Sequence, residues 1–133
     1  MEYGINGKSG RMGEKNNREI GSRYEKKAVS FLEQKGYLVL ETNYRNRYGE
    51  IDIIASKDGF LVFVEVKYRT SQQYGDPLEA VDGWKQRRIC RSALYYCSKL
   101  AEGLEVPCRF DVIAIYGEEQ QIRHIENAFE YME

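Results

Sequence analysis

The sequence predicts an α/β fold in which a helix is followed by three strands, a second helix and a fourth strand. Apolar residues recur at helical spacing before Gly36 and again between Ile89 and Leu100. The two segments that flank Asp58-Gly59 alternate instead between apolar and polar residues, and residues 109–116 are almost wholly apolar. This order predicts a mixed sheet flanked by helices.

The first helix is expected over residues 18–35, where Tyr24, Ala28, Phe31 and Leu32 share one face and Gly36 supplies a C-terminal stop. Residues 1–17 are rich in Gly, Asn and Lys and show no hydrophobic period, so we expect a flexible N-terminal tail. The chain of 133 residues then forms a single domain over residues 18–133.

Three strands are expected next, over residues 37–43, 48–56 and 60–68. Asp58-Gly59 separates the second from the third and is typical of a two-residue hairpin turn, because both central residues of that turn need a positive φ.

A second helix is expected from Asp76 to Leu100, with a break near Gly83. Asp76 followed by Pro77 and, three residues on, Glu79 is typical of a helix start. Residues 109–116 should form an interior strand, and residues 122–125 a short strand at an edge.

The composition is that of an ordinary globular protein, with 42% hydrophobic and 31% charged residues and a formal net charge of −1. No apolar run is long enough to span a bilayer, and the N-terminus lacks the apolar stretch of a signal peptide, so we expect a cytoplasmic protein without a membrane partner. The three cysteines lack CxxC spacing and there is one histidine, His124, which we expect to be structural. Free thiols are therefore expected, and a bound metal should have oxygen ligands.

The hairpin turn predicts which side chains meet across the two strands. If Lys57 lies opposite Phe60, then Asp52 lies opposite Glu65 and Glu50 lies opposite Lys67, all on one face. The other face receives only apolar residues, which are Ile51, Ile53, Ala55, Val62, Val64 and Val66.

Two carboxylates about 5 Å apart destabilise a sheet unless something neutralises them. A divalent cation would do so, because Mg²⁺ is often held by one or two carboxylates together with substrate phosphates. Lys67 is on the same face and could orient or deprotonate a water, or stabilise charge on a phosphate. Asp52, Glu65 and Lys67 thus fit phosphodiester hydrolysis. The alternative, of roughly equal weight on patterning alone, is a plain Glu50–Lys67 ion pair beside solvated carboxylates.

At these residues the sequence resembles the YraN family of predicted endonuclease-like proteins, part of the PD-(D/E)xK, or restriction-endonuclease-like, superfamily. Residues 48–55 and 62–67 carry the resemblance, which extends from about Gly21 to Phe129. Ile51 stands where the proline of the superfamily name would be. The resemblance implies a restriction-endonuclease-like αβββαβ core, which agrees with the order of elements read from periodicity.

The resemblance also implies roles for individual residues. Asp52 and Glu65 would be metal ligands, helped by the carbonyl of Val66, and Lys67 would be the catalytic lysine. Glu25, in the first helix, is similar to an acid that often joins the site.

Basic side chains that could contact phosphates gather in two stretches despite the negative net charge. They are Arg45, Arg47, Lys85, Arg87, Arg88 and Arg91. The alternative interpretation is that these side chains only form a solvated surface. Glu50 and Gln86 are candidates for supporting roles, with Glu50 favoured as a partner of Lys67.

The leading hypothesis is a Mg²⁺- or Mn²⁺-dependent endonuclease-like hydrolase that acts on DNA, including branched or structured forms. The alternative is a non-catalytic module that binds nucleic acid or docks on a DNA-processing protein. A third reading is a structural protein whose acidic face pairs internally. The sequence leaves open whether the protein forms a homodimer.

Overall fold

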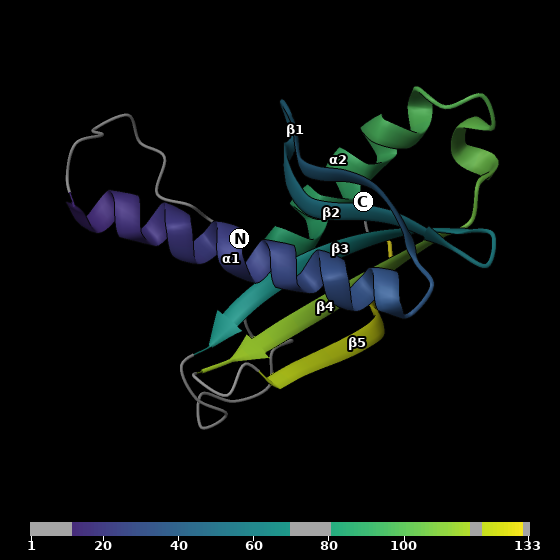
Figure 1. The fold of residues 1–133 in the computed structure, drawn as a ribbon. Helices are drawn as coiled ribbons and strands as arrows, with labels where there is room; N and C mark the ends of the chain where they lie inside the picture. Colours follow the sequence, from purple (N-terminus) through teal and green to yellow (C-terminus); the bar gives the residue numbers. More distant parts are fainter. Residues whose placement is uncertain (1–11, 70–80, 118–120, 132–133) are drawn as a thin grey trace.

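A computed structural model describes residues 12–69, 81–117 and 121–131 and shows an α/β fold with one five-stranded mixed sheet (Figure 1). The elements follow one another as α1 (Met12–Gln34), β1 (Leu38–Asn46), β2 (Gly49–Lys57), β3 (Phe60–Arg69), α2 (Gly83–Ser98), the short 3-10 helix η3 (Gly103–Glu105), β4 (Cys108–Tyr116) and β5 (Gln121–Phe129). The strands lie side by side in chain order, and only the β3–β4 pair is parallel. The predicted order of helices and strands is confirmed.

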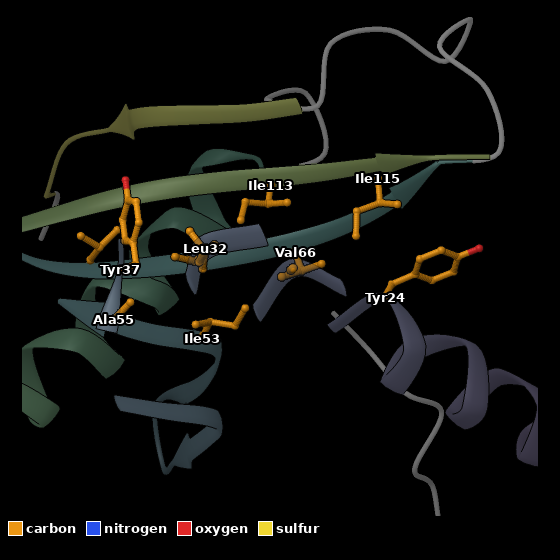
Figure 2. Close-up of a cluster of buried hydrophobic side chains, with 11 residues drawn as sticks. Tyr24, Leu32, Tyr37, Ile53, Ala55, Val66, Ile113 and Ile115 are labelled. Carbon is orange, nitrogen blue, oxygen red and sulfur yellow. The ribbon is translucent and has the colours of Figure 1, made fainter. Parts of the chain in front are cut away.

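The two helices cover opposite faces of the sheet, so the protein has two hydrophobic cores (Figure 1). On the α1 side, Tyr24 and Leu32 pack against Ile53, Val66 and Ile113 (Figure 2). On the α2 side, the helix packs its apolar stripe against the other face of the sheet, with the buried residues Ile51, Ile54, Leu61, Phe63, Val81, Ile89, Cys90, Ala93, Cys97, Phe110 and Val112. A sheet buried on both faces explains why β3 and β4 consist almost wholly of apolar residues.

Several boundaries differ from the prediction. Helix α1 begins at Met12 rather than Arg18. Helix α2 begins only at Gly83, because the side chain of Asp82 caps it by accepting a hydrogen bond of 2.9 Å from the backbone N–H of Lys85. The start predicted at Asp76 lies outside the described residues, as do residues 1–11 of the predicted tail. Strand β5 is an edge strand, as predicted, but extends to Phe129.

The hairpin turn is confirmed, with φ of 50° at Asp58 and 85° at Gly59. The predicted register holds from Lys57–Phe60 to Ile53–Val64 and stops there. The pairs predicted beyond it, Asp52–Glu65 and Glu50–Lys67, are not among the paired positions. Beyond Val64, strand β3 pairs only with β4, where Lys67 lies opposite Ala114.

The alternation of side chains also fails at this point. Ile51 was expected on the face of Ile53, but it packs in the α2-side core together with Ile54. Residues three apart share a face only where a strand departs from regular pleating. The prediction was wrong here because β2 separates from β3 just beyond Ile53.

A buried polar network joins β4 to β5. Asp111 is fully buried and accepts hydrogen bonds of 2.9 Å from both Nε and one terminal nitrogen of Arg109, and one of 3.0 Å from the backbone N–H of Asn127. His124 Nε2 lies 2.7 Å from the same carboxylate, which supports the structural role expected for His124. The three cysteines are free, as predicted. In the described part of the chain, no helix has the length and apolar character needed to cross a membrane.

Changing Asp111 to Asn should destabilise the protein near pH 7 by about 3 kcal/mol, because Arg109, which is largely shielded from water, would lose its nearest counter-charge. Burial alone would raise the pKa of Asp111, but the hydrogen bonds from His124 and Arg109 hold it below the usual 3.8. The unfolded chain therefore binds the proton more readily, so this stabilisation exists above about pH 4 and is lost as the pH falls through the folded pKa.

Urea unfolding of both proteins between pH 2 and pH 7 measures the effect. The gap between wild type and Asp111→Asn should narrow toward acid, whereas the exposed control Glu33→Gln should track wild type throughout. A gap that stays constant with pH would contradict this account.

Candidate functional site

The candidate site forms where β2 leaves β3. Asp52 is fully buried, and its Oδ2 accepts a hydrogen bond of 2.8 Å from the backbone N–H of Val66. A carboxylate therefore satisfies a donor of β3 just beyond the last paired residues of the hairpin. The bond fixes Asp52 directly beside the segment that carries Glu65 and Lys67.

Glu65 is 4% exposed and meets two ammonium groups. Its Oε2 lies 3.1 Å from Nζ of Lys67, two residues along β3, and 2.5 Å from Nζ of Lys85 in the first turn of α2. The Lys67 contact replaces the Glu50–Lys67 pair that was favoured from sequence, since Glu50 pairs with Arg45 at 3.6 Å. The site thus joins β2, β3 and α2.

The two acids titrate differently because their neighbours differ. Burial, followed by the negative charge of Glu65, raises the pKa of Asp52 to about 7. Burial also acts to raise the pKa of Glu65, but nearby positive charges, among them the ammonium groups of Lys67 and Lys85, outweigh it and lower that pKa. Ionised Glu65 therefore disfavours the charged form of Asp52.

The two lysines also differ. Burial lowers the pKa of Lys67, and the neighbouring charge of Lys85 adds to this. Burial acts in the same direction on Lys85, but the pKa of Lys85 is raised because the attraction of Glu65 prevails. Lys67 is therefore the easier of the two to deprotonate, as a proton-transfer role would require.

Glu25 lies at the side of α1 that faces the sheet and is 7% exposed. Its Oε1 accepts a hydrogen bond of 2.7 Å from Nδ2 of Asn43. Asn43 has a left-handed backbone with φ of 53°, a conformation that Asn tolerates better than most residues, and it lies between the β1 residues that pair with Ile51 and Ile53. Glu25 therefore supports the strand segment opposite Asp52, and its role as a ligand stays a prediction.

A pocket of about 370 Å³ lies next to Glu65, between the β1–β2 turn and α2. We call it the basic pocket, because four of its ten lining residues are cationic. The lining residues are Arg45, Asn46, Arg47, Gly49, Glu50, Glu65, Trp84, Lys85, Arg88 and Ile89. Two stretches that are distant in the sequence and rich in arginine thus meet at one acidic side chain.

The structure brings together four of the six basic residues predicted to contact nucleic acid, namely Arg45, Arg47, Lys85 and Arg88. Arg87 and Arg91 are exposed on α2 and are not among the lining residues. Gln86 donates a hydrogen bond of 2.8 Å to the carbonyl of Val81, so it supports the start of α2. A direct supporting role for Gln86 at the carboxylates stays a prediction.

Sequence reasoning missed Trp84, which lines the basic pocket, and the ion pair between Lys85 and Glu65. Trp84 is the single tryptophan of the chain and immediately precedes the basic stretch of α2, which is a signal that could have been read. Nothing in the residue pattern could have placed Lys85 on Glu65, because the contact depends on how α2 packs against the sheet.

The donor set fits a hard divalent cation that is only partly held by protein. Among the residues that the structure describes, no three His, Cys, Asp or Glu side chains come together in a way that could hold a metal. Asp52 and Glu65 do provide two neighbouring carboxylates, and Mg²⁺ is commonly bound by one or two carboxylates with water and substrate phosphate completing its shell. Mn²⁺ accepts the same oxygen ligands.

Comparison with known proteins adds a family to this geometry. The sequence model of an uncharacterised protein family, UPF0102, matches residues 24–115. A UPF0102 protein of Lachnoclostridium phytofermentans is 49% identical over 117 residues, which cover 86% of this chain and 96% of that relative. UPF0102 proteins of Thermodesulfovibrio yellowstonii and Geobacter metallireducens are also 49% identical, over 84% and 86% of this chain and over 96% and 94% of their own lengths. The family description names no activity.

In the absence of metal, Asp52→Asn should stabilise the protein at pH 8. The pKa of Asp52 is about 7 in the folded protein and 3.8 in the unfolded chain, so the folded state binds more protons between these values and loses stability as the pH rises through them. The asparagine carbonyl can still accept the hydrogen bond from Val66 but carries no charge. The gain should reach as much as about 4 kcal/mol, since each pKa unit is worth about 1.4 kcal/mol.

Urea unfolding in EDTA at pH 5 and at pH 8 checks this. The advantage of Asp52→Asn should be larger at pH 8, whereas Glu33→Gln should show no change between the two. A variant less stable than wild type at pH 8 would show that the ionised carboxylate is not repelled in the folded protein.

Proposed function

The chain belongs to the uncharacterised protein family UPF0102, which is the YraN family that its sequence resembles, and on this premise we propose that it is a metal-dependent nuclease hydrolysing phosphodiester bonds in DNA. One observation carries the proposal. Glu65 lies beside the buried Asp52 and contacts Lys67, and it also lines a pocket that is lined by Arg45, Arg47, Lys85 and Arg88. Acidic ligands, a half-buried lysine and a surface suited to phosphate are the parts that this hydrolysis needs.

In this proposal, Asp52 and Glu65 hold Mg²⁺ or Mn²⁺ together with the carbonyl of Val66. The metal, when bound, supplies Lewis-acid stabilisation of the phosphate and a more acidic water. Asp52 is well placed for this, because the backbone of Val66 fixes its carboxylate through the 2.8 Å hydrogen bond. A ligand whose orientation is fixed in advance loses little freedom when the metal binds.

Lys67 is the residue we assign to proton handling and charge stabilisation. Its Nζ lies 3.1 Å from Glu65 Oε2, and burial lowers its pKa, so it can give up a proton more readily than an exposed lysine. Held there, it can orient the attacking water or neutralise charge that builds on the phosphate.

The balance of charge suggests how metal and substrate are coupled. Asp52 and Glu65 contribute two negative charges when ionised, and Lys67 and Lys85 contribute two positive charges. A divalent cation added alone would leave the site positive, whereas a phosphodiester brings compensating negative charge. We therefore infer that metal binds more tightly when DNA is present.

A second candidate function is a non-catalytic module that binds nucleic acid or docks on a DNA-processing protein. It is favoured by the 2.5 Å contact of Lys85 with Glu65, because this ion pair neutralises the acid without a metal. Such a module would bind DNA in a salt-dependent way and leave it intact.

Cleavage of labelled linear, single-stranded, flapped and four-way DNA, with Mg²⁺ or Mn²⁺ and with EDTA, tests the nuclease proposal. Wild type should cut at least one substrate only when metal is present. Glu65→Gln and Lys67→Met should each reduce the rate by about a hundredfold or more, because each removes a ligand or a charge-stabilising group. Lys99→Met, which changes an exposed lysine beyond α2, is the matched control and should cut at the wild-type rate.

Metal-independent cutting would contradict the proposed chemistry. Salt-dependent DNA binding without cleavage by wild type, under all metal conditions, would instead select the non-catalytic module.

Direct titration with Mn²⁺ tests the charge balance. Lys85→Met should bind Mn²⁺ at least about threefold more tightly than wild type, because it removes a cation that competes for Glu65. Asp52→Asn should bind it more weakly, because it removes a ligand. Equal affinity in all three proteins, measured by calorimetry or by the paramagnetic signal of free Mn²⁺, would place the metal elsewhere.

A further inference from the structure

The basic pocket contains an aromatic surface that phosphodiester hydrolysis itself does not require. Trp84, in the first turn of α2, is 65% exposed although it lines the pocket together with Glu65 and Lys85. Tryptophan is usually largely buried, and exposing its ring to water sacrifices stabilisation. The buried side of α2 is made by Ile89, Ala93 and other residues, so Trp84 is not needed for the core.

Neighbouring groups order the ring of Trp84. The guanidinium carbon of Arg88, one helical turn further on, lies 4.9 Å from the ring centroid. Nε of Arg88 also donates a hydrogen bond of 3.3 Å to the backbone carbonyl of Tyr48. Arg88 is therefore held between α2 and the β1–β2 turn, and it stacks with the indole while its charge faces the pocket region.

A second cation–aromatic pair lies across the pocket. The guanidinium of Arg47 lies 4.9 Å from the ring centroid of Tyr48, and its terminal nitrogen donates a hydrogen bond of 2.7 Å to the Tyr48 hydroxyl. Arg45 adds a further charge and is paired with Glu50 at 3.6 Å. The pocket thus combines one exposed aromatic ring with arginines on both sides. Proteins that bind single-stranded nucleic acid use this combination.

We propose that the basic pocket binds an unpaired nucleobase stacked on Trp84, with Arg45, Arg47 and Arg88 contacting the flanking phosphates. A volume of about 370 Å³ is within the range of pockets that take small planar ligands. A base inside a duplex cannot occupy it, because neighbouring base pairs cover both of its faces. The substrate class is therefore single-stranded DNA, or an unpaired segment of branched DNA. This inference rests on the proposed function for the cleavage that follows binding, but the stacking does not depend on cleavage.

Trp84 is itself the probe for a direct test, because it is the only tryptophan of the chain. The wild-type protein in EDTA is titrated with a twelve-residue single-stranded oligothymidylate and, separately, with a blunt twelve-base-pair duplex, and the two are compared at equal phosphate concentration. The single strand should quench tryptophan fluorescence saturably, and the duplex should bind more weakly and quench little. Equal quenching by both, or none by either, would overturn the inference.

Variants separate stacking from charge. In anisotropy titrations with a labelled strand, Trp84→Ala should weaken binding on the order of tenfold, the factor expected from loss of one base–aromatic stack. Trp84→Phe, which keeps an aromatic face, should recover most of the affinity. Tyr131→Ala removes another exposed aromatic residue, away from the pocket, and should bind like wild type. Wild-type affinity in Trp84→Ala would overturn the proposal, as would equal loss in both Trp84 variants.

The two proposals fail differently. Single-strand quenching without any metal-dependent cleavage would retain the base-binding pocket and reject the nuclease. Metal-dependent cleavage that ignores strandedness and is unchanged in Trp84→Ala would retain the nuclease and reject the pocket.

Discussion

The hydrogen bond from the backbone of Val66 to the Asp52 carboxylate is the interaction on which the site depends. Beyond Ile53 and Val64 the two central strands no longer pair, and a side chain replaces the missing partner. This hydrogen bond satisfies the buried N–H of Val66 and at the same time holds Asp52 beside Glu65. Burial and that neighbouring charge keep the pKa of Asp52 near 7, so the fold holds an acid in an environment that disfavours its charged form.

Charge compensation then links this acidic pair to the rest of the molecule. Lys67 approaches Glu65 from the same strand and Lys85 approaches it from α2, which places the first turn of that helix beside the site. The same turn carries Trp84, and the next carries Arg88. One buried carboxylate therefore positions both the residues we assign to chemistry and the residues we assign to substrate binding. A buried network around Asp111 secures the β4–β5 side of the sheet, where Arg109 balances the charge of the carboxylate.

Much of this could be predicted from the sequence, because it follows from local patterns. Alternation and the Asp58-Gly59 turn predicted the hairpin register correctly from Lys57 to Ile53 and placed Asp52 near Glu65 and Lys67. The departure of β2 at Asp52 could not be read in this way, because nothing in the alternation shows where a strand pair separates. The position of Lys85 was equally hidden, since the docking of α2 on the sheet decides it. Trp84 carried a signal in its rarity, but only the fold shows that it is exposed next to an acidic pair.

The central claim is that Asp52 and Glu65 form a metal site rather than an internally paired acidic cluster. A crystal structure of the protein soaked with Mn²⁺ and a non-hydrolysable oligonucleotide, with anomalous difference density measured at the manganese edge, tests it most directly. The account predicts an anomalous peak in contact with both carboxylates and with a bound phosphate. A phosphate bound in the basic pocket without any such peak, and with Lys85 still on Glu65, would contradict it.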